Sequence, residues 1–347
     1  MPEPDGAGGP TAVRDDDAMA EGLAAWLAAR RGLTDPTVGG LRRPSAGYSS
    51  DTVFAQVGWS TDHGPEQASL VVRMAPPVVG TFRHYDLVSQ GQAQRAAAAV
   101  GVPVADPQVE TDARWLGAPF MVMPRVEGHI IGAVAHLDRW LTGLDPDDQG
   151  RVHDNFVATL AAVHRADVGS APDVPRRDNS AELDHWEEYL DWSSSGSPVT
   201  AVADALAWCR RHQPADEPAP ALLWGDARFE NMVLGDDLRP RAVLDWDMTS
   251  VGAPEHDLAW FTALDLTMDR LFGRRLAGFP DRDGTVARFE EVSGRRVRDL
   301  EWYETLAMVR STAVMTRIGY LRLQAGLPLL LPIDDNPVID VLTSRLR

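Results

Sequence analysis

Residues 222–247 constrain this chain more than any other segment. The runs LLW, NMVL and AVLD are typical of short strands, and residues 235–237 (Gly-Asp-Asp) supply a turn between the last two. Asp226 follows the first run, Asn231 begins the second and Asp245 ends the third. We therefore expect these three polar side chains to lie at strand ends along one edge.

This pattern matches the needs of phosphoryl transfer. A carboxylate orients the proton of an attacking hydroxyl, and an amide oxygen and a second carboxylate hold Mg²⁺ on nucleotide phosphates. A D-x-x-x-x-N loop followed by a metal-binding Asp is also the arrangement of protein-kinase catalytic loops. Asp and Asn favour turns in any protein, so the triplet alone leaves ordinary loop residues as an alternative.

The next residues, GAPEHDLAW at 252–260, narrow the choice. Together with WGDARFEN at 224–231 and VLDWD at 243–247, they resemble the aminoglycoside phosphotransferase and choline-kinase-like family, in particular antibiotic phosphotransferases of an actinobacterial type. The resemblance runs from about residue 41 to about residue 261. It implies a two-lobed, protein-kinase-like α+β fold, with a small β-rich N-terminal lobe and a larger, mainly helical C-terminal lobe.

Domain boundaries follow from this resemblance and from composition. We expect a disordered tail at 1–15, a nucleotide-binding lobe at 16–125 with a hinge near 121–126, and a catalytic and acceptor-binding lobe at 127–347. A helix is predicted to begin near Asp15 and to end at Gly32.

In the C-terminal lobe the resemblance implies a role for each polar residue. Asp226 would orient the acceptor hydroxyl as the catalytic residue, and Asn231 and Asp245 would bind Mg²⁺. Asp247 would face a cationic acceptor or the surroundings of the metal. Asp257 would brace the catalytic loop structurally, through hydrogen bonds.

Phosphate contacts are expected from the N-terminal lobe. The strand SLVVRM places Arg73 where the family has a phosphate-binding Lys or Arg, and the chain contains no lysine at all. Ser49 and Ser50 belong to a small-residue turn that would cover the phosphates. The family's acidic partner for the strand cation falls near Gln90, which is uncharged.

The purine base would bind at the hinge. Backbone groups there would hydrogen-bond its edge, and Met121, Met123 and Val126 would form apolar walls, although methionine also fills cores anywhere. The co-substrate is therefore ATP or GTP with Mg²⁺, and the sequence does not distinguish the two purines.

The acceptor site is expected in the acidic, aromatic segment 173–198. Glu187 and Glu188 are possible acceptor-binding residues, with a solvated helix face as the alternative. Trp224 stands where the family has a histidine, so the catalytic loop needs a different support. His256 is expected at the surface.

Composition limits the partners. The net charge of −18 argues against nucleic acid and anionic membrane, and reflects either a cationic substrate or solubility. No apolar run approaches the roughly 18–20 residues that span a bilayer. The N-terminus lacks a signal-peptide pattern and Cys209 is the single cysteine, so a cytoplasmic location is expected, with the oligomeric state open.

The leading interpretation is an O-phosphotransferase that modifies an antibiotic, either an aminoglycoside or a nucleoside antibiotic, and so confers resistance. A housekeeping kinase for an amino alcohol, a sugar or a homoserine-like acceptor is the alternative. A pseudokinase predicts the loss of Asp226, Asn231 or Asp245, and all three are present. A protein kinase would need a long activation loop after Asp245, for which the chain leaves no room.

Overall fold

The computed structural model describes residues 14–44, 50–194 and 199–346. The chain divides into two compact units. The first comprises the residues up to Gly91 together with Ala105–Arg125 and Tyr320–Pro328, and the second comprises Gln92–Val104, Val126–Gly319 and the residues from Leu329 onward. Residues 1–13, most of the expected tail, lie outside the described part of the chain.

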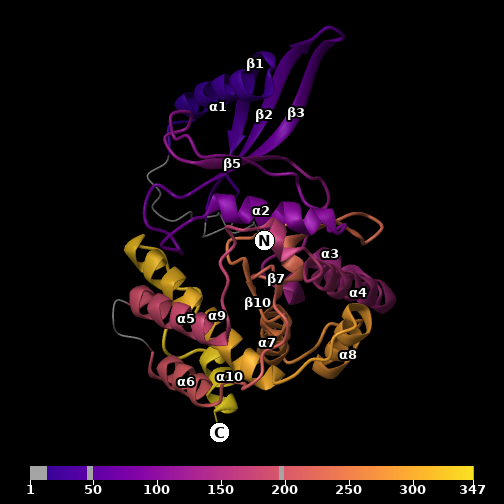
Figure 1. Cartoon of the computed structure of the whole chain (residues 1–347), viewed down its shortest axis with the longest axis vertical. Coiled ribbons are helices and arrows are strands. Elements are labelled where there is room, and N and C mark those ends of the chain that lie inside the picture. The colour runs from indigo at the N-terminus through magenta and orange to yellow at the C-terminus, as the bar shows by residue number, and fades with distance from the viewer. Residues whose placement is uncertain (1–13, 45–49, 195–198, 347) are drawn as a thin grey trace. The chain divides into compact units, whose positions relative to one another are not determined.

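The first unit is built on an antiparallel sheet with the strand order β1-β2-β3-β5-β4 (Figure 1). Its elements are α1 (Asp16–Arg31), β1 (Thr34–Arg42), β2 (Asp51–Thr61), β3 (Gly64–Met74), β4 (Gln108–Glu110) and β5 (Phe120–Pro124). Strands β2 and β3 pair along their whole length from Asp51–Met74 to Thr61–Gly64.

Helix α1 begins and ends where the sequence predicts. The Asp15 side chain accepts a hydrogen bond from the Ala18 backbone N–H, and Gly32 ends the helix with a φ of 66°. The apolar face of the helix consists of Met19, Leu23, Trp26 and Leu27, which are all buried in one core with inward residues of the sheet. This packing fixes which face of the sheet is covered.

The second unit is mainly helical. Helix α2 (Leu87–Ala99) runs from the first unit into the second, and α9 (Leu300–Gln324) runs from the second into the first. The other helices are α3 (Arg139–Gly143), α4 (Pro146–Val163), α5 (Asn179–Ser193), α6 (Thr200–Arg211), α7 (Glu255–Phe272), α8 (Arg282–Ser293) and α10 (Pro337–Arg345), with short 3₁₀ turns η1 (Ala135–Leu137), η2 (Val168–Ser170) and η3 (Phe229–Asn231).

Two small sheets in this unit carry the segment 222–247. Strands β6 (His129–Ile130), β8 (Met232–Leu234) and β9 (Pro240–Val243) form one, and β7 (Ala221–Leu223) pairs with β10 (Ser250–Gly252) in the other. The three predicted strands and the turn between the last two are therefore confirmed.

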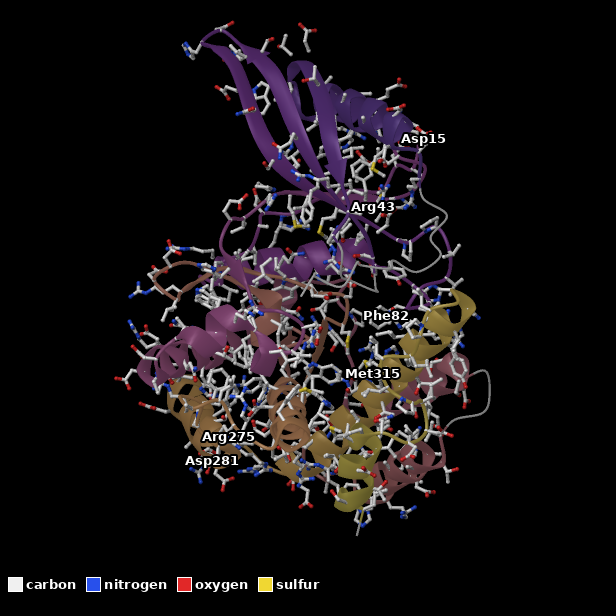
Figure 2. The ribbon with its side chains drawn as sticks, turned by 180° about the vertical axis from the view of Figure 1, so that it is seen from behind. Asp15, Arg43, Phe82, Arg275, Asp281 and Met315 are labelled. Atoms are coloured by element: carbon white, nitrogen blue, oxygen red, sulfur yellow. The ribbon has the colours of Figure 1, made fainter. Side chains whose placement is uncertain are left out.

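Aspartates cap several helices and fix where they begin. Asp145 caps α4, with Pro146 in its first turn, and Val152 and Phe156 are buried. Figure 2 shows Asp15 and Asp281 at the starts of α1 and α8, where each side chain accepts a backbone hydrogen bond. The expected α+β composition, β-rich first and helical afterwards, is confirmed. Within the described ranges no helix is long and apolar enough to cross a membrane.

Candidate active site

Asp226 lies in a tight turn directly after β7. The turn requires glycine at position 225, because its φ is +92° and an added Cβ would lie 2.2 Å from the Met248 carbonyl oxygen. Strand β7 delivers the chain to this turn, and α7 holds it from the other side through the contacts described below. Local sequence therefore determines the backbone that presents the Asp226 carboxylate.

The Asp226 carboxylate is held from three directions. The Trp260 indole N–H donates to Oδ1 at 2.8 Å, and the Asn231 amide donates to Oδ2 at 2.7 Å. The Arg228 guanidinium forms an ion pair with Oδ1 at 3.0 Å. The side chain keeps 15% of its surface exposed, so a hydroxyl group has access to a carboxylate whose orientation is already fixed.

Asn231 and Asp245 are connected through the backbone. The Leu244 N–H donates to the Asn231 carbonyl at 2.8 Å, and Asp245 follows with a φ of 57°. The Asn231 amide nitrogen is used by the Asp226 carbonyl and carboxylate, so the Asn231 side-chain oxygen is turned away from Asp226. One amide oxygen and one carboxylate suit Mg²⁺, which prefers oxygen ligands.

No group of three or more His, Cys, Asp or Glu side chains within the described ranges has metal-site geometry. A Mg²⁺ ion held by Asn231 and Asp245 would therefore complete its shell with nucleotide phosphates and water. This is the usual mode for Mg²⁺ on a nucleotide, and the residues present fit it.

Arg228 is a site residue that the sequence analysis missed. Burial acts to lower the pKa of its guanidinium, but the carboxylates of Asp226, Glu230 and Asp245 outweigh burial and raise it above its ordinary value. Arg228 therefore stays charged beside the Asp226 carboxylate. Its position two residues after Asp226 in the GDARFEN segment was the signal available in the sequence.

Asp257, at the start of α7, supports the loop from behind. Its fully buried carboxylate accepts hydrogen bonds from the backbone N–H groups of Trp224 at 2.7 Å and Gly225 at 2.9 Å, and pairs with His164 Nε2 at 3.1 Å. The Trp224 indole donates to the Leu244 carbonyl at 2.7 Å. Trp224 thus ties the loop to the residue before Asp245, which is a different support from the family's histidine.

The prediction that His256 lies at the surface is wrong. His256 is 2% exposed, with Nε2 3.1 Å from the Asn179 side-chain oxygen and its ring edge-on to Tyr303. Burial lowers the pKa of His256 to about 4, so the ring is neutral near pH 7. The reason is tertiary: α5 and α9 cover this turn of α7.

The acidic residues proposed for the acceptor site lie on two separate segments of the chain. Glu187 and Glu188 lie on the exposed face of α5, and Glu187 forms an ion pair with Arg210 of α6. Asp247 is half-buried in the segment between β9 and β10, next to the buried Trp246. The structure thus gives the positions of Glu187, Glu188 and Asp247, and an acceptor role for each of them stays a prediction.

In the first unit, the proposed phosphate and base contacts share one face of the sheet. Thr52 pairs with Arg73 and Arg73 pairs with Met121 across the strands, and Met123 lies two residues along the same strand, so these side chains alternate away from the α1-covered core. The Arg73 guanidinium donates to the Ser50 hydroxyl at 3.0 Å. The structure therefore groups Arg73 with Ser50 and the two methionines.

The remaining predicted positions are scattered. Ser49 lies outside the described residues. Val126 is half-buried and belongs to the second unit. Gln90 is 2% exposed, and its side-chain oxygen has no hydrogen-bond partner among the residues that the structure describes.

Comparison with known proteins determines the family. Residues 40–292 match the phosphotransferase enzyme family, which is well over half of the chain. The chain belongs to this family. It is therefore an enzyme of the phosphotransferase type.

The curated sequence relatives and the similar solved structures carry different protein names. Acyl-CoA dehydrogenase family member 11 of Homo sapiens is 26% identical over 223 residues, which cover 62% of this chain and 27% of that protein. This chain thus spans about a quarter of the length of the curated relatives it matches.

Among solved structures, a candidate aminoglycoside phosphotransferase from Ralstonia eutropha JMP134 has a TM-score of 0.67 at 20% identity, with 94% of this chain and 95% of that chain covered. A thermostable variant of aminoglycoside phosphotransferase APH(4)-Ia, in a ternary complex with AMP-PNP and hygromycin B, has a TM-score of 0.56 at 15% identity, with 94% and 98% covered. These likenesses confirm the expected fold.

Proposed function

We propose that this protein transfers the γ-phosphate of ATP or GTP to a hydroxyl group of a small molecule. The observation that carries the proposal is the carboxylate of Asp226, oriented by Trp260 and Asn231 while part of it stays accessible. A merely structural aspartate would not need three partners and an open side. Retention of Asn231 and Asp245 beside it supports an active phosphotransferase over a pseudokinase.

Each residue contributes to positioning or to charge. Asp226 accepts a hydrogen bond from the acceptor hydroxyl and aligns its oxygen with the γ-phosphorus. As the new P–O bond forms, the bond to the leaving diphosphate breaks and the hydroxyl proton departs through Asp226. Asn231 and Asp245 hold Mg²⁺, which neutralises phosphate charge when bound. Arg228 adds a fixed positive charge beside the reacting centre.

Nucleotide contacts are proposed for the sheet face that carries Arg73. Its planar guanidinium grips phosphate oxygens in pairs and stays charged at any working pH, so it replaces the lysine that this chain lacks. Ser50 fixes the orientation of that guanidinium. Met121 and Met123, with Val126, supply apolar contacts to a purine base.

Two acceptor classes have specific support. Structures of the same fold include a complex with the antibiotic hygromycin B and a macrolide 2′-phosphotransferase, and they favour an antibiotic hydroxyl as the acceptor. In this case the protein confers resistance. A location in the cytoplasm, where both nucleotides are abundant, accompanies this proposal.

The second acceptor class is a hydroxyl on an acyl chain, handled in primary metabolism. The curated relatives carry a matching segment within proteins named acyl-CoA dehydrogenases. The geometry also argues against a polycationic acceptor, because Glu187 is paired with Arg210 while the Arg228 guanidinium lies 3.0 Å from the Asp226 carboxylate. This observation favours a neutral or anionic acceptor.

The deciding experiment measures nucleoside-diphosphate release from MgATP and MgGTP in the presence of aminoglycosides, macrolides, nucleoside antibiotics, amino alcohols and hydroxyacyl thioesters. We expect acceptor-dependent release that falls steeply in Asp226→Asn but leaves a measurable residual rate. Release that stays the same in Asp226→Asn would refute the mechanism. Nucleotide binding without Mg²⁺ dependence, and without transfer to any acceptor, would favour the pseudokinase.

A further inference from the structure

Arg310 is a buried cation on α9 that the mechanism above does not use. Its side chain is almost fully enclosed, with 3% of the residue exposed. It lies in a buried stretch of the helix, LAMVRSTAV, that carries no other charged residue. A charge in such a place requires compensating partners, and the identity of those partners shows what it does.

The guanidinium of Arg310 lies between two indole rings. Its central carbon is 4.9 Å from the Trp260 ring centre and 5.2 Å from the Trp186 ring centre. On one side Nη2 donates to the Gly225 carbonyl at 3.2 Å, and on the other Nε is 3.9 Å from the Glu182 carboxylate. Arg310 thus joins α5, α7 and the turn that carries Asp226.

Two of these contacts bear directly on the catalytic carboxylate. Gly225 is the residue immediately before Asp226, and its backbone carbonyl accepts the Arg310 hydrogen bond. Trp260 is the residue whose indole N–H holds Asp226 Oδ1 at 2.8 Å. A single guanidinium therefore determines both the backbone position and one of the three side-chain partners of Asp226.

Stability alone does not account for this arrangement. Replacing a buried ion pair by well-packed apolar residues is often neutral or stabilising, so a buried arginine is poor evidence of a purely structural role. Burial lowers the pKa of Arg310, and the charges of Glu182, Asp257 and Asp226 oppose that effect. Glu182 is held in turn by Arg177 at 3.1 Å and by the Trp186 indole at 2.7 Å.

We propose that Arg310 is a positioning residue that holds Asp226 in its reactive orientation through Gly225 and Trp260, with Glu182 and Trp186 as its anchor on α5. The inference rests on the proposed function, because it assigns Asp226 the catalytic role. It adds a coupling between the helix expected to meet the acceptor and the catalytic carboxylate. Arg310 itself touches neither substrate nor nucleotide.

The test begins with Arg310→Met, which keeps length and apolar bulk but removes the charge and the donors. We expect kcat to fall about 10- to 100-fold, the effect of losing the one charge-assisted hydrogen bond to the Gly225 carbonyl, while the nucleotide KM changes less than about 2-fold. The matched control is Arg345→Met. Arg345 also pairs with a buried acid of α9, Glu304, at 2.9 Å, and its replacement should leave kcat unchanged.

A double-mutant cycle separates positioning from a general structural effect. In an Asp226→Asn background, Arg310→Met should cause no further loss of the residual rate, because its only route to the reaction runs through Asp226. Independent losses that multiply would overturn the inference. An equal loss of kcat in Arg345→Met would overturn it too, because both effects would then reflect weakened packing.

Two milder variants keep the test decisive if Arg310→Met does not fold. Arg310→Lys keeps a charge but loses the planar donor fork, and Trp260→Phe keeps a ring but loses the donor to Asp226; each should lower kcat without raising the nucleotide KM. Wild-type rates in either variant would refute the inference. If the wild-type enzyme transfers no phosphate, the proposed function fails. If the wild-type enzyme is active and the Arg310 and Trp260 variants transfer phosphate at the wild-type rate, the proposed function stands and only the positioning role of Arg310 fails.

Discussion

Asp257→Asn tests whether the catalytic loop depends on one buried carboxylate. Asp257 accepts hydrogen bonds from the Trp224 and Gly225 backbone N–H groups and pairs with His164, and none of its surface is exposed. Asparagine has the same shape but only one acceptor oxygen. Its NH₂ group must therefore face at least one N–H that previously donated to the carboxylate.

The size of the effect follows from these contacts. A hydrogen bond to a charged group contributes about 1.5–3 kcal/mol, and a buried donor left without a partner costs a further ~1–3 kcal/mol. We expect Asp257→Asn to lower the free energy of unfolding by about 3–5 kcal/mol, a large share of the ~5–15 kcal/mol typical of folded proteins. Phosphotransfer should fall at least in parallel, because Gly225 precedes Asp226.

Urea denaturation followed by circular dichroism measures the loss, and hydrogen exchange at the Trp224 and Gly225 amides locates it. The matched control is Asp178→Asn, at the exposed start of α5, where the carboxylate accepts a single N–H from Ala181 at 2.8 Å. Asparagine caps helices as well as aspartate, so this variant should be nearly unchanged. A loss below about 1 kcal/mol in Asp257→Asn, with both amides still protected, would show that the loop is held by other contacts.

Three further predictions address the nucleotide, the metal and the pH dependence. Arg73→Met should raise the nucleotide KM severalfold with little change in the acceptor KM; an unchanged nucleotide KM would place the phosphate cation elsewhere. Asn231→Ala should raise the Mg²⁺ concentration needed for half-maximal rate by about tenfold, the equivalent of one lost ligand contact of about 1.4 kcal/mol, and a Mg²⁺ titration checks it. Burial, with the neighbouring charge of Asp269, raises the pKa of Asp265 from 3.8 to about 7. The folded protein therefore binds a proton there that the unfolded chain releases, and stability from this group, complete below about pH 4, is lost as the pH rises through 7. Asp265→Asn should consequently be more stable than wild type at pH 8 in urea denaturation and should lose that advantage by pH 4, whereas a constant difference between the two would contradict the shift.

The features that the sequence predicted correctly depend on interactions between residues that lie close together in the chain. The cap of α1 at Asp15 and its stop at Gly32 depend on residues within one turn of the helix. The turn after Leu234 depends on residues that directly adjoin it. The spacing from Asp226 to Asn231 also brings the two side chains together, because a single 3₁₀ turn separates them.

Long-range packing was not predictable in the same way. His256 has polar neighbours in sequence, and its burial depends on Asn179 and Tyr303, which lie far away along the chain. Glu182 belongs to the same acidic segment as Glu187 and Glu188, although its face of the helix turns toward Arg310. The sign available in the sequence was Arg310 within the stretch LAMVRSTAV of α9, and this stretch does not reveal which carboxylate the arginine contacts.

The left-handed backbone at Asp245 limits how this position can change during evolution. Its φ of 57° suits glycine, asparagine and aspartate, and strains most other residues. Binding a metal, in contrast, calls for a carboxylate, and glutamate supplies one only with that strain. Aspartate alone satisfies both the left-handed backbone and the proposed metal role, so a saturation library scored for folding should retain Asp245→Asn and Asp245→Gly, whereas a library scored for phosphotransfer should retain neither.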